Sequence, residues 1–267
     1  LKYDISANVS TLKNKVTSLG IGKDSYISGA YATYVGQGIG QFYGWVYKGI
    51  ARTQEDLDNN AVQQGANVGD CLYEDISGPD GTPDGVIDAY DQTVLGSGLP
   101  KVNFGLSTHL EYKGFDLNIS TYGVLNYHVS DDIYNSLNSC YGYGNKEVGM
   151  LDANRWSEDG TYLSSVPRTY AANNATLAWN DLFSSRKIQN AAYWKIANVE
   201  LGYNFPDKWF GGYVSGVRLY VSAQNLYTFT GYHGYNVDYA GGTFTPGYNF
   251  CSFPSARTFM AGIHFTF

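Results

Sequence analysis

Charged residues are scarce in this chain. Asp, Glu, Lys and Arg make up 15% of its 267 residues, whereas a soluble domain of this size usually carries about 25%. The formal net charge is −7, and the basic residues form no cluster. Recognition of nucleic acid requires basic patches that neutralise phosphates, so the sequence argues against a DNA- or RNA-binding protein.

Cysteine is also rare. Cys71, Cys140 and Cys251 are the only three, and they lie far apart without the spacing of metal ligands. A disulfide framework or a zinc site is therefore not expected. The chain also lacks an apolar run long enough for a transmembrane helix, because glycines and glutamines interrupt the uncharged stretch 25–47.

Sequence motifs of catalysis are missing as well. The chain contains neither His-Glu-x-x-His nor Gly-x-Ser-x-Gly, and no Walker lysine follows the glycine-rich turn at 36–40. His109 and His264 fall on the polar side of alternating strands. A structural role as hydrogen-bonded polar residues is therefore expected for them, rather than a role as catalytic bases. We therefore expect a protein that is not an enzyme.

A signal peptide does not precede the first residues, which already alternate as in a strand. A secreted or outer-membrane protein needs such a peptide. We therefore expect the chain to be part of a longer protein whose N-terminal portion lies outside this sequence.

The chain is rich in aromatic residues, at 16%, and in glycine, at 32 residues. Its clearest pattern is alternation with a period of two, as in the last strand, where Phe259, Ile263 and Phe265 oppose His264 and Thr266. Similar runs cover 1–9, 102–112, 115–119, 198–205 and 217–224, with weaker ones near 25–35 and 40–48. We expect about eight strands, most of them about ten residues long, which is enough to cross a bilayer when tilted.

The connections between these strands alternate between short and long. Lys113 and Gly114 form a tight turn and 206–215 a short one, whereas 49–101, 126–190 and 227–254 are long. Short turns at one end and long loops at the other are typical of outer-membrane barrels. The sequence thus predicts an all-β fold, a transmembrane antiparallel β-barrel with long extracellular loops. The residues predicted to face lipid are Phe259, Ile263, Phe265, Leu201, Leu219 and Leu106.

An acidic loop spans residues 75–91. Flexible loops with several carboxylates suit Ca²⁺, which takes many oxygen ligands. The spacing is not that of an EF-hand, and a set of Asx-turns without metal is the alternative. The candidate Ca²⁺ ligands are Asp75, Asp80, Asp84, Asp88 and Asp91.

Aromatic residues are frequent in the long loops. Sugars and peptides both bind to aromatic faces with a few polar partners, although such residues can equally pack the loops together. The candidate ligand-binding residues are Trp156, Trp179, Tyr141, Tyr143, Tyr232 and Tyr235.

Several segments together resemble a known family. They are 41–44, the acidic loop, 112–116, 194–206, 221–226 and 254–257 leading into the final strand. In order and spacing they resemble the C-terminal part of SusC/RagA-type TonB-dependent outer-membrane transporters, over nearly the whole chain.

The resemblance implies a barrel of about 22 strands with an N-terminal plug. Residues 1–267 would be the C-terminal portion of that barrel, in the bacterial outer membrane. It also implies energy from TonB through the absent N-terminal part, a SusD-like surface lipoprotein as partner, and import of oligosaccharides or peptides. The alternatives are a small complete barrel, acting as a porin or adhesin, and a secreted carbohydrate-binding β-protein.

Overall fold

The computed structural model describes every residue except 21, 140–144, 149–165, 170–178, 211–213 and 239–240. Described residues lie mainly in strands and loops. The α-helices among them are short: α1 (Gln54–Asp58) and α2 (Asp132–Leu137). Single turns of 3₁₀ helix are η1 (Ala89–Asp91), η3 (Trp179–Asp181), η4 (Ser185–Lys187) and η5 (Asp207–Trp209).

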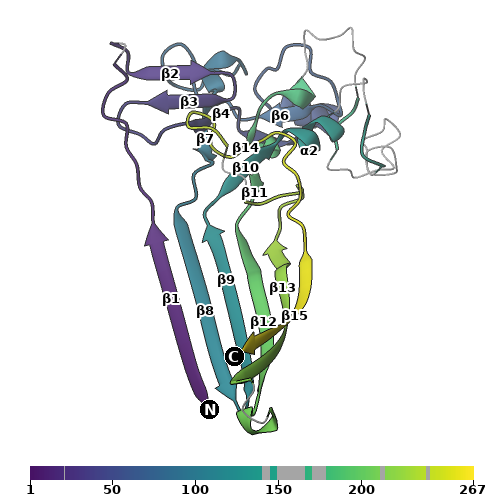
Figure 1. Cartoon of the computed structure of the whole chain (residues 1–267). Helices are drawn as coiled ribbons and strands as arrows, with labels where there is room; N and C mark the ends of the chain where they lie inside the picture. The colour runs from purple at the N-terminus through teal and green to yellow at the C-terminus, as the bar shows by residue number, and fades with distance from the viewer. Residues whose placement is uncertain (21, 140–144, 149–165, 170–178, 211–213, 239–240) are drawn as a thin grey trace.

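Long strands form one six-stranded antiparallel sheet in the order β1–β8–β9–β12–β13–β15, which occupies the lower half of Figure 1. Its strands are β1 (Lys2–Thr11), β8 (Val102–Tyr112), β9 (Phe115–Leu125), β12 (Tyr193–Phe205), β13 (Gly216–Thr230) and β15 (Thr258–Thr266). The two edge strands, β1 and β15, do not pair with each other, so the described sheet is an open segment of a barrel wall.

Short connections gather at one end of this sheet (Figure 1). Lys113 and Gly114 have φ angles of 48° and 90° and close the β8–β9 hairpin with Tyr112 opposite Phe115. Positive φ at both central residues is the conformation that two-residue hairpins favour, because it matches the strand twist. The predicted tight turn is confirmed.

Long connections gather at the opposite end, where their described residues form a layer that we call the crown (the described residues of 12–101, 126–192 and 231–257) (Figure 1). It holds three small sheets, β2–β3–β4–β7, β5–β6 and β11–β10–β14. Their strands are β2 (Ser25–Ser28), β3 (Tyr31–Tyr34), β4 (Gln41–Gly44), β5 (Tyr47–Ile50), β6 (Cys71–Tyr73), β7 (Thr93–Ser97), β10 (His128–Asp131), β11 (Gln189–Asn190) and β14 (Tyr248–Asn249).

The strand count predicted from the sequence was too high for the main sheet. Segments 25–35 and 40–48 do form strands, but these are four residues long and belong to crown sheets. Their alternation is interrupted by Gly29, Gly36 and Gly40, all at positive φ. Six long strands, rather than about eight, therefore form the barrel wall in the described residues.

Burial follows the same division between wall and crown. The hydrophobic core clusters lie in the crown and at its junction with the wall, one around Tyr127 and Tyr232 and the other around Tyr73 and Ile87. Large apolar side chains on the wall, such as Ile263, are instead exposed. None of the helices in the described part of the chain is long and apolar enough to span a membrane.

Candidate functional site

The wall sheet has two chemically distinct faces. The pairing register places apolar residues of neighbouring strands beside one another on one face, which we call the apolar face. One such row across five strands contains Leu110, Leu117, Leu201, Val221 and Ala261. All six residues predicted to face lipid lie on this face and are exposed, by 40% at Leu106 and up to 68% at Phe259. Their contact with lipid stays a prediction.

The opposite face, which we call the polar face, carries the charged residues of the strands. Arg218 donates from Nε to Asp116 at 3.0 Å and from Nη2 to Glu200 at 2.7 Å. Asn204 adds a hydrogen bond to Asp116 at 2.8 Å. Three strands, β9, β12 and β13, are thus tied together by one charged cluster near the short turns.

A second charged group lies on the polar face where the wall meets the crown. Lys195 is almost fully buried and forms an ion pair with Asp238 of the crown. Its ammonium lies 5.8 Å from the ring centre of Tyr122, whose hydroxyl is 3.3 Å from Asp238. Burial of this cation is compensated by the carboxylate and the aromatic face.

The register of β12 explains how Lys195 reaches the polar face. A bulge lies between Ile196 and Asn198 in the pairing with both neighbouring strands. An extra residue inverts the alternation, so Lys195 points to the same side as Glu200. Trp194 instead joins the apolar face, where it stacks on Phe229 with ring centres 5.2 Å apart.

The acidic loop is ordered by its own carboxylates. Asp91 is fully buried and accepts hydrogen bonds from the backbone N–H groups of Ile76, Ser77 and Asp88. Asp75 accepts from Gly85 at 2.7 Å. These are turn and capping interactions, which would order the loop if it were a set of Asx-turns that binds no metal.

Further carboxylates of the loop make similar contacts. Asp84 accepts from Val86 at 3.0 Å and Asp88 from Tyr90 at 2.7 Å, whereas Asp80 is exposed. No group of three or more His, Cys, Asp or Glu side chains in the described part of the chain is arranged to hold a metal ion. Ca²⁺ binding by the loop stays a prediction.

The predicted ligand-binding aromatics have different environments. Tyr141, Tyr143 and Trp156 lie outside the described residues. Trp179 packs on Tyr73 and donates to the backbone oxygen of Gln64. Tyr235 is 65% exposed and lines a cavity of about 330 Å³ together with Lys195 and Arg257.

Tyr232 belongs to the crown core instead. Its hydroxyl donates to Asp131 and accepts from Asn249 at 2.7 Å, while Asn249 also bonds Asp131 at 3.1 Å. Burial, followed by the nearby Asp131 carboxylate, raises the pKa of Tyr232. The three groups satisfy one another and tie Tyr232 and Asn249 to Asp131 of β10. Sequence reasoning missed this set because its members are about 17 to 118 positions apart and follow no motif.

Comparison with known proteins identifies relatives over almost the whole chain. TonB-dependent receptor P3 of Formosa agariphila is 30% identical over 283 residues, which cover 99% of this chain and 27% of the relative. TonB-dependent receptor SusC of Bacteroides thetaiotaomicron is 24% identical and is covered to 24%. The chain therefore spans about a quarter of the length of the curated relatives it matches. No family model matches it.

Solved structures agree with the observed fold. A structure of the RagAB peptide transporter superimposes with a TM-score of 0.76 at 22% identity, covering 98% of this chain and 26% of that chain. A RagAB peptide importer in a closed-closed state gives 0.73 at 21% identity. At this level of identity the likeness concerns the fold alone. The open antiparallel sheet and its crown are a segment of that type of barrel, as the sequence predicted.

Proposed function

The chain is homologous over 99% of its length to TonB-dependent receptors, which include SusC, and we propose that it forms part of an outer-membrane barrel that imports nutrients. The single observation that carries this proposal is the division of the wall sheet into two faces. A sheet with exposed leucine, isoleucine and phenylalanine on one side and ion pairs on the other suits hydrocarbon outside and water or protein inside.

Import against a gradient requires an energy source, which we assign to TonB. The coupling would act through a part of the protein outside this sequence. The substrate would be an oligosaccharide or a peptide, the classes that the sequence resemblance implies; RagAB is described as a peptide transporter. The role proposed is transport without catalysis.

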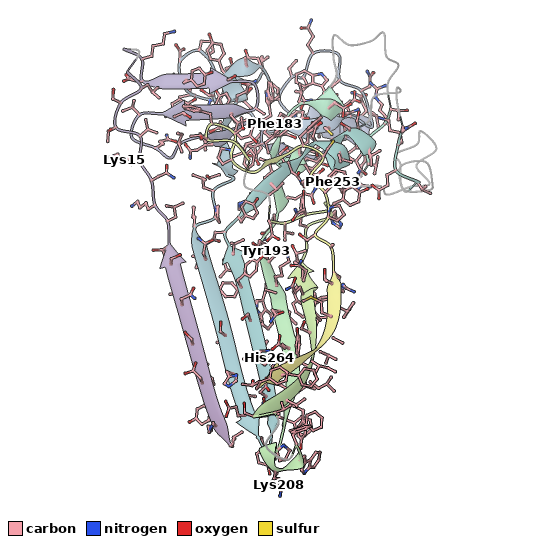
Figure 2. All side chains as sticks on the ribbon, in the orientation of Figure 1. Lys15, Phe183, Tyr193, Lys208, Phe253 and His264 are labelled. Carbon is pink, nitrogen blue, oxygen red and sulfur yellow. The ribbon has the colours of Figure 1, made fainter. Side chains whose placement is uncertain are left out.

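A SusD-like surface lipoprotein is the proposed partner, seated on the crown. Support comes from apolar side chains that the crown exposes: Phe253 is 89% exposed, and Phe250 is 60% exposed. Figure 2 shows Phe253 on the crown side of the strands, far from Lys208 at the short-turn end. Exposed aromatic side chains of this kind are typical of protein interfaces.

Deleting the gene for the full-length protein and measuring depletion of oligosaccharides and peptides from the medium would test the proposal. We expect one of the two classes to remain in the medium, and uptake to return with the wild-type gene. A second test is fractionation, in which the full-length protein should require detergent for extraction. Unchanged uptake, or a protein soluble without detergent, would refute the transport role.

A further inference from the structure

A cavity of about 330 Å³ opens where β13 and the start of β15 separate, at the junction of the wall and the crown. β13 extends to Thr230, but β15 pairs with it only as far as Gln224. The cavity lies beside the part of β13 that β15 leaves uncovered, and its lining includes Tyr227, Ser255 and Arg257. We call it the Arg257 cavity. The proposed transport role does not use it.

The charges around this cavity favour an anion. Arg257 is exposed, and no carboxylate among the described residues pairs with it. The other cation, Lys195, is compensated by Asp238, and the described lining contains neither Asp nor Glu. The hydroxyl groups of Tyr227 and Ser255 also lack a hydrogen-bond partner in the part of the chain that the structure describes. One guanidinium and two hydroxyl groups can therefore donate to the oxygens of an anionic ligand.

The backbone that carries Arg257 is attached to β13. The side-chain amide of Asn225 donates to the backbone oxygen of Ala256 at 2.9 Å, directly before Arg257. Asn225 itself has a φ of 51°, a conformation that asparagine tolerates better than most residues. An anchored backbone holds the guanidinium at the cavity before a ligand arrives, which lowers the entropic cost of binding.

The cavity borders the apolar face of the wall. Tyr227 contacts Phe229, with ring centres 4.7 Å apart, and Phe229 stacks on Trp194. In β15, alternation places Arg257 at the crown end of the apolar row that continues with Phe259, which is 68% exposed. A cation at the end of an exposed apolar row fits a molecule with an anionic head and a hydrocarbon tail.

The opposite edge of the wall has the same order of residues. The apolar row of β1 includes Val9, and the next charged residues in phase with it are Lys13 and Lys15. Both lysines are exposed and have no ion-pair partner among the described residues. Between them, the side chain of Asn14 accepts from the backbone N–H of Ile39 in the crown. Figure 2 shows Lys15 just beyond the crown end of β1. Basic residues thus follow the apolar face at the crown end of both edge strands.

From these observations we infer that the Arg257 cavity binds the phosphate group of a lipid in the leaflet on the crown side of the membrane. Arg257 would donate to two phosphate oxygens with its planar fork, and Tyr227 and Ser255 would donate to the others. Donors from several directions suit a tetrahedral phosphate better than a planar carboxylate. The acyl chains would lie on the apolar face beside Phe259. This inference rests on the proposed outer-membrane location and is independent of transport.

Native mass spectrometry of the full-length protein in detergent tests the site with four probes. Lysophosphatidic acid has a phosphate and an acyl chain, glycerol 3-phosphate has only the phosphate, monooleoylglycerol has only the chain, and oleate has a chain with a carboxylate. Lysophosphatidic acid should bind more tightly than each of the other three. Equal or tighter binding of glycerol 3-phosphate would indicate a site for soluble phosphates, and equal or tighter binding of oleate or monooleoylglycerol would remove the need for phosphate. Each of these results would overturn the inference.

Variants then locate the binding. Arg257→Gln should lower the affinity for lysophosphatidic acid about tenfold or more, as expected for the loss of a charged hydrogen bond. Arg257→Lys keeps the charge without the planar fork and should retain part of the affinity. Ser255→Phe should also weaken binding, because it fills the cavity without changing the charge. Lys23→Gln removes one charge from an exposed crown residue outside the cavity, so this matched control should bind like wild type.

Binding and import separate the two proposals. Lipid binding that Arg257→Gln and Ser255→Phe leave at the level of Lys23→Gln would overturn the lipid site, even if uptake depends on the gene. Lipid binding that both cavity variants weaken, in a protein whose gene deletion leaves uptake unchanged, would keep the lipid site and refute the transport role.

Discussion

Arg218 of β13 reaches Asp116 of β9 across the intervening strand β12, with two hydrogen bonds between guanidinium and carboxylate. The bridge passes over Gly202, where an added Cβ would lie 2.5 Å from Arg218 Nη2 and 2.6 Å from Asp116 Oδ2. Glycine at this position therefore leaves the room that a charged link between non-adjacent strands requires.

Breaking this link should destabilise the wall. Arg218→Met leaves the Asp116 carboxylate, which is 5% exposed, without its cation, and we expect a loss of about 1–3 kcal/mol in the free energy of unfolding. The urea-unfolding midpoint of the full-length protein in detergent micelles measures it. Lys2→Met removes the exposed Lys2–Glu111 pair instead and should change stability little, because water and salt screen an exposed ion pair. Equal effects of the two variants would contradict this account.

A charge on the apolar face should be costly in a bilayer. Ile263 lies beside Leu219 and is 58% exposed, so Ile263→Arg should destabilise the inserted barrel by about 2–4 kcal/mol if the site is near the midplane. Met260 lies on the polar face beside Ser222, three positions away, which makes Met260→Arg the matched control. Folding titrations in lipid vesicles should show a small effect for the control. A larger destabilisation by Met260→Arg than by Ile263→Arg would mean that the opposite face of the sheet contacts lipid.

Removing a carboxylate from the acidic loop tests whether it binds metal. If the loop holds Ca²⁺, Asp84→Ala should lower the Ca²⁺ content of the purified full-length protein and speed proteolysis of 75–91. Elemental analysis gives the metal content, with Asp58→Ala in α1 as the control. An unchanged metal content would show that the loop does not bind Ca²⁺. The hydrogen-bonded turns alone would then account for the order of the loop.

His128 should make the crown sensitive to acid. Burial first, and then the charge of Lys101, lower its pKa from the ordinary value of 6.5. The folded crown therefore binds fewer protons than the unfolded chain, so its stability is complete above about pH 6.5 and falls as the pH drops below that value. Hydrogen exchange of the segment 128–131, corrected for intrinsic rates, should be faster at pH 5.5 than at pH 7.5.

The His128→Gln variant should lose this pH-dependent difference, because it has no group to protonate there. His233→Gln, also in the crown, should keep the wild-type difference and serves as the control. A difference that persists in His128→Gln would assign the acid sensitivity to another group.

Exposed phenylalanines of the crown should contribute to partner binding. Phe253→Ser combined with Phe250→Ser should weaken co-purification of the surface lipoprotein, because both side chains are exposed and their loss leaves the wall strands intact. The control is Trp209→Ser, equally apolar and 62% exposed but at the short-turn end. Undiminished co-purification in the crown variant would place the partner elsewhere.

Alternation along the wall strands made the main fold predictable from the sequence. Each pairing in the sheet brings residues of like character together, as for Leu201 between Leu117 and Val221. This period-two signal is strong because one face must be apolar throughout. The tight turn at Lys113 and Gly114 was predictable for a similar reason, since glycine readily adopts positive φ.

The crown was much less predictable. Its strands are short, and their partners come from distant parts of the chain, as when Ser130 pairs with Tyr248. Tyr232 was predicted to bind ligand from its place in a loop, yet it is buried against Asp131. Composition cannot separate an aromatic residue that packs a loop from one that contacts a ligand. The bulge in β12 was not predicted either, because Lys195 interrupts the alternation of apolar and polar residues only once.

That bulge decides which residues of β12 between Trp194 and Val199 lie on each face of the wall. Strict alternation over the full length of the strand would place Lys195 on the apolar face and Trp194 on the polar one, and the extra residue Ala197 prevents this. Deleting Ala197 would remove the irregularity from the pairing with β9 and leave Ile196 on the apolar face and Lys195 on the polar face, so the ion pair with Asp238 that holds the crown would be kept. Single-residue deletions should therefore be tolerated at the bulge and rejected elsewhere in the strand, a rule that reading-frame-preserving length variants of the strand can check.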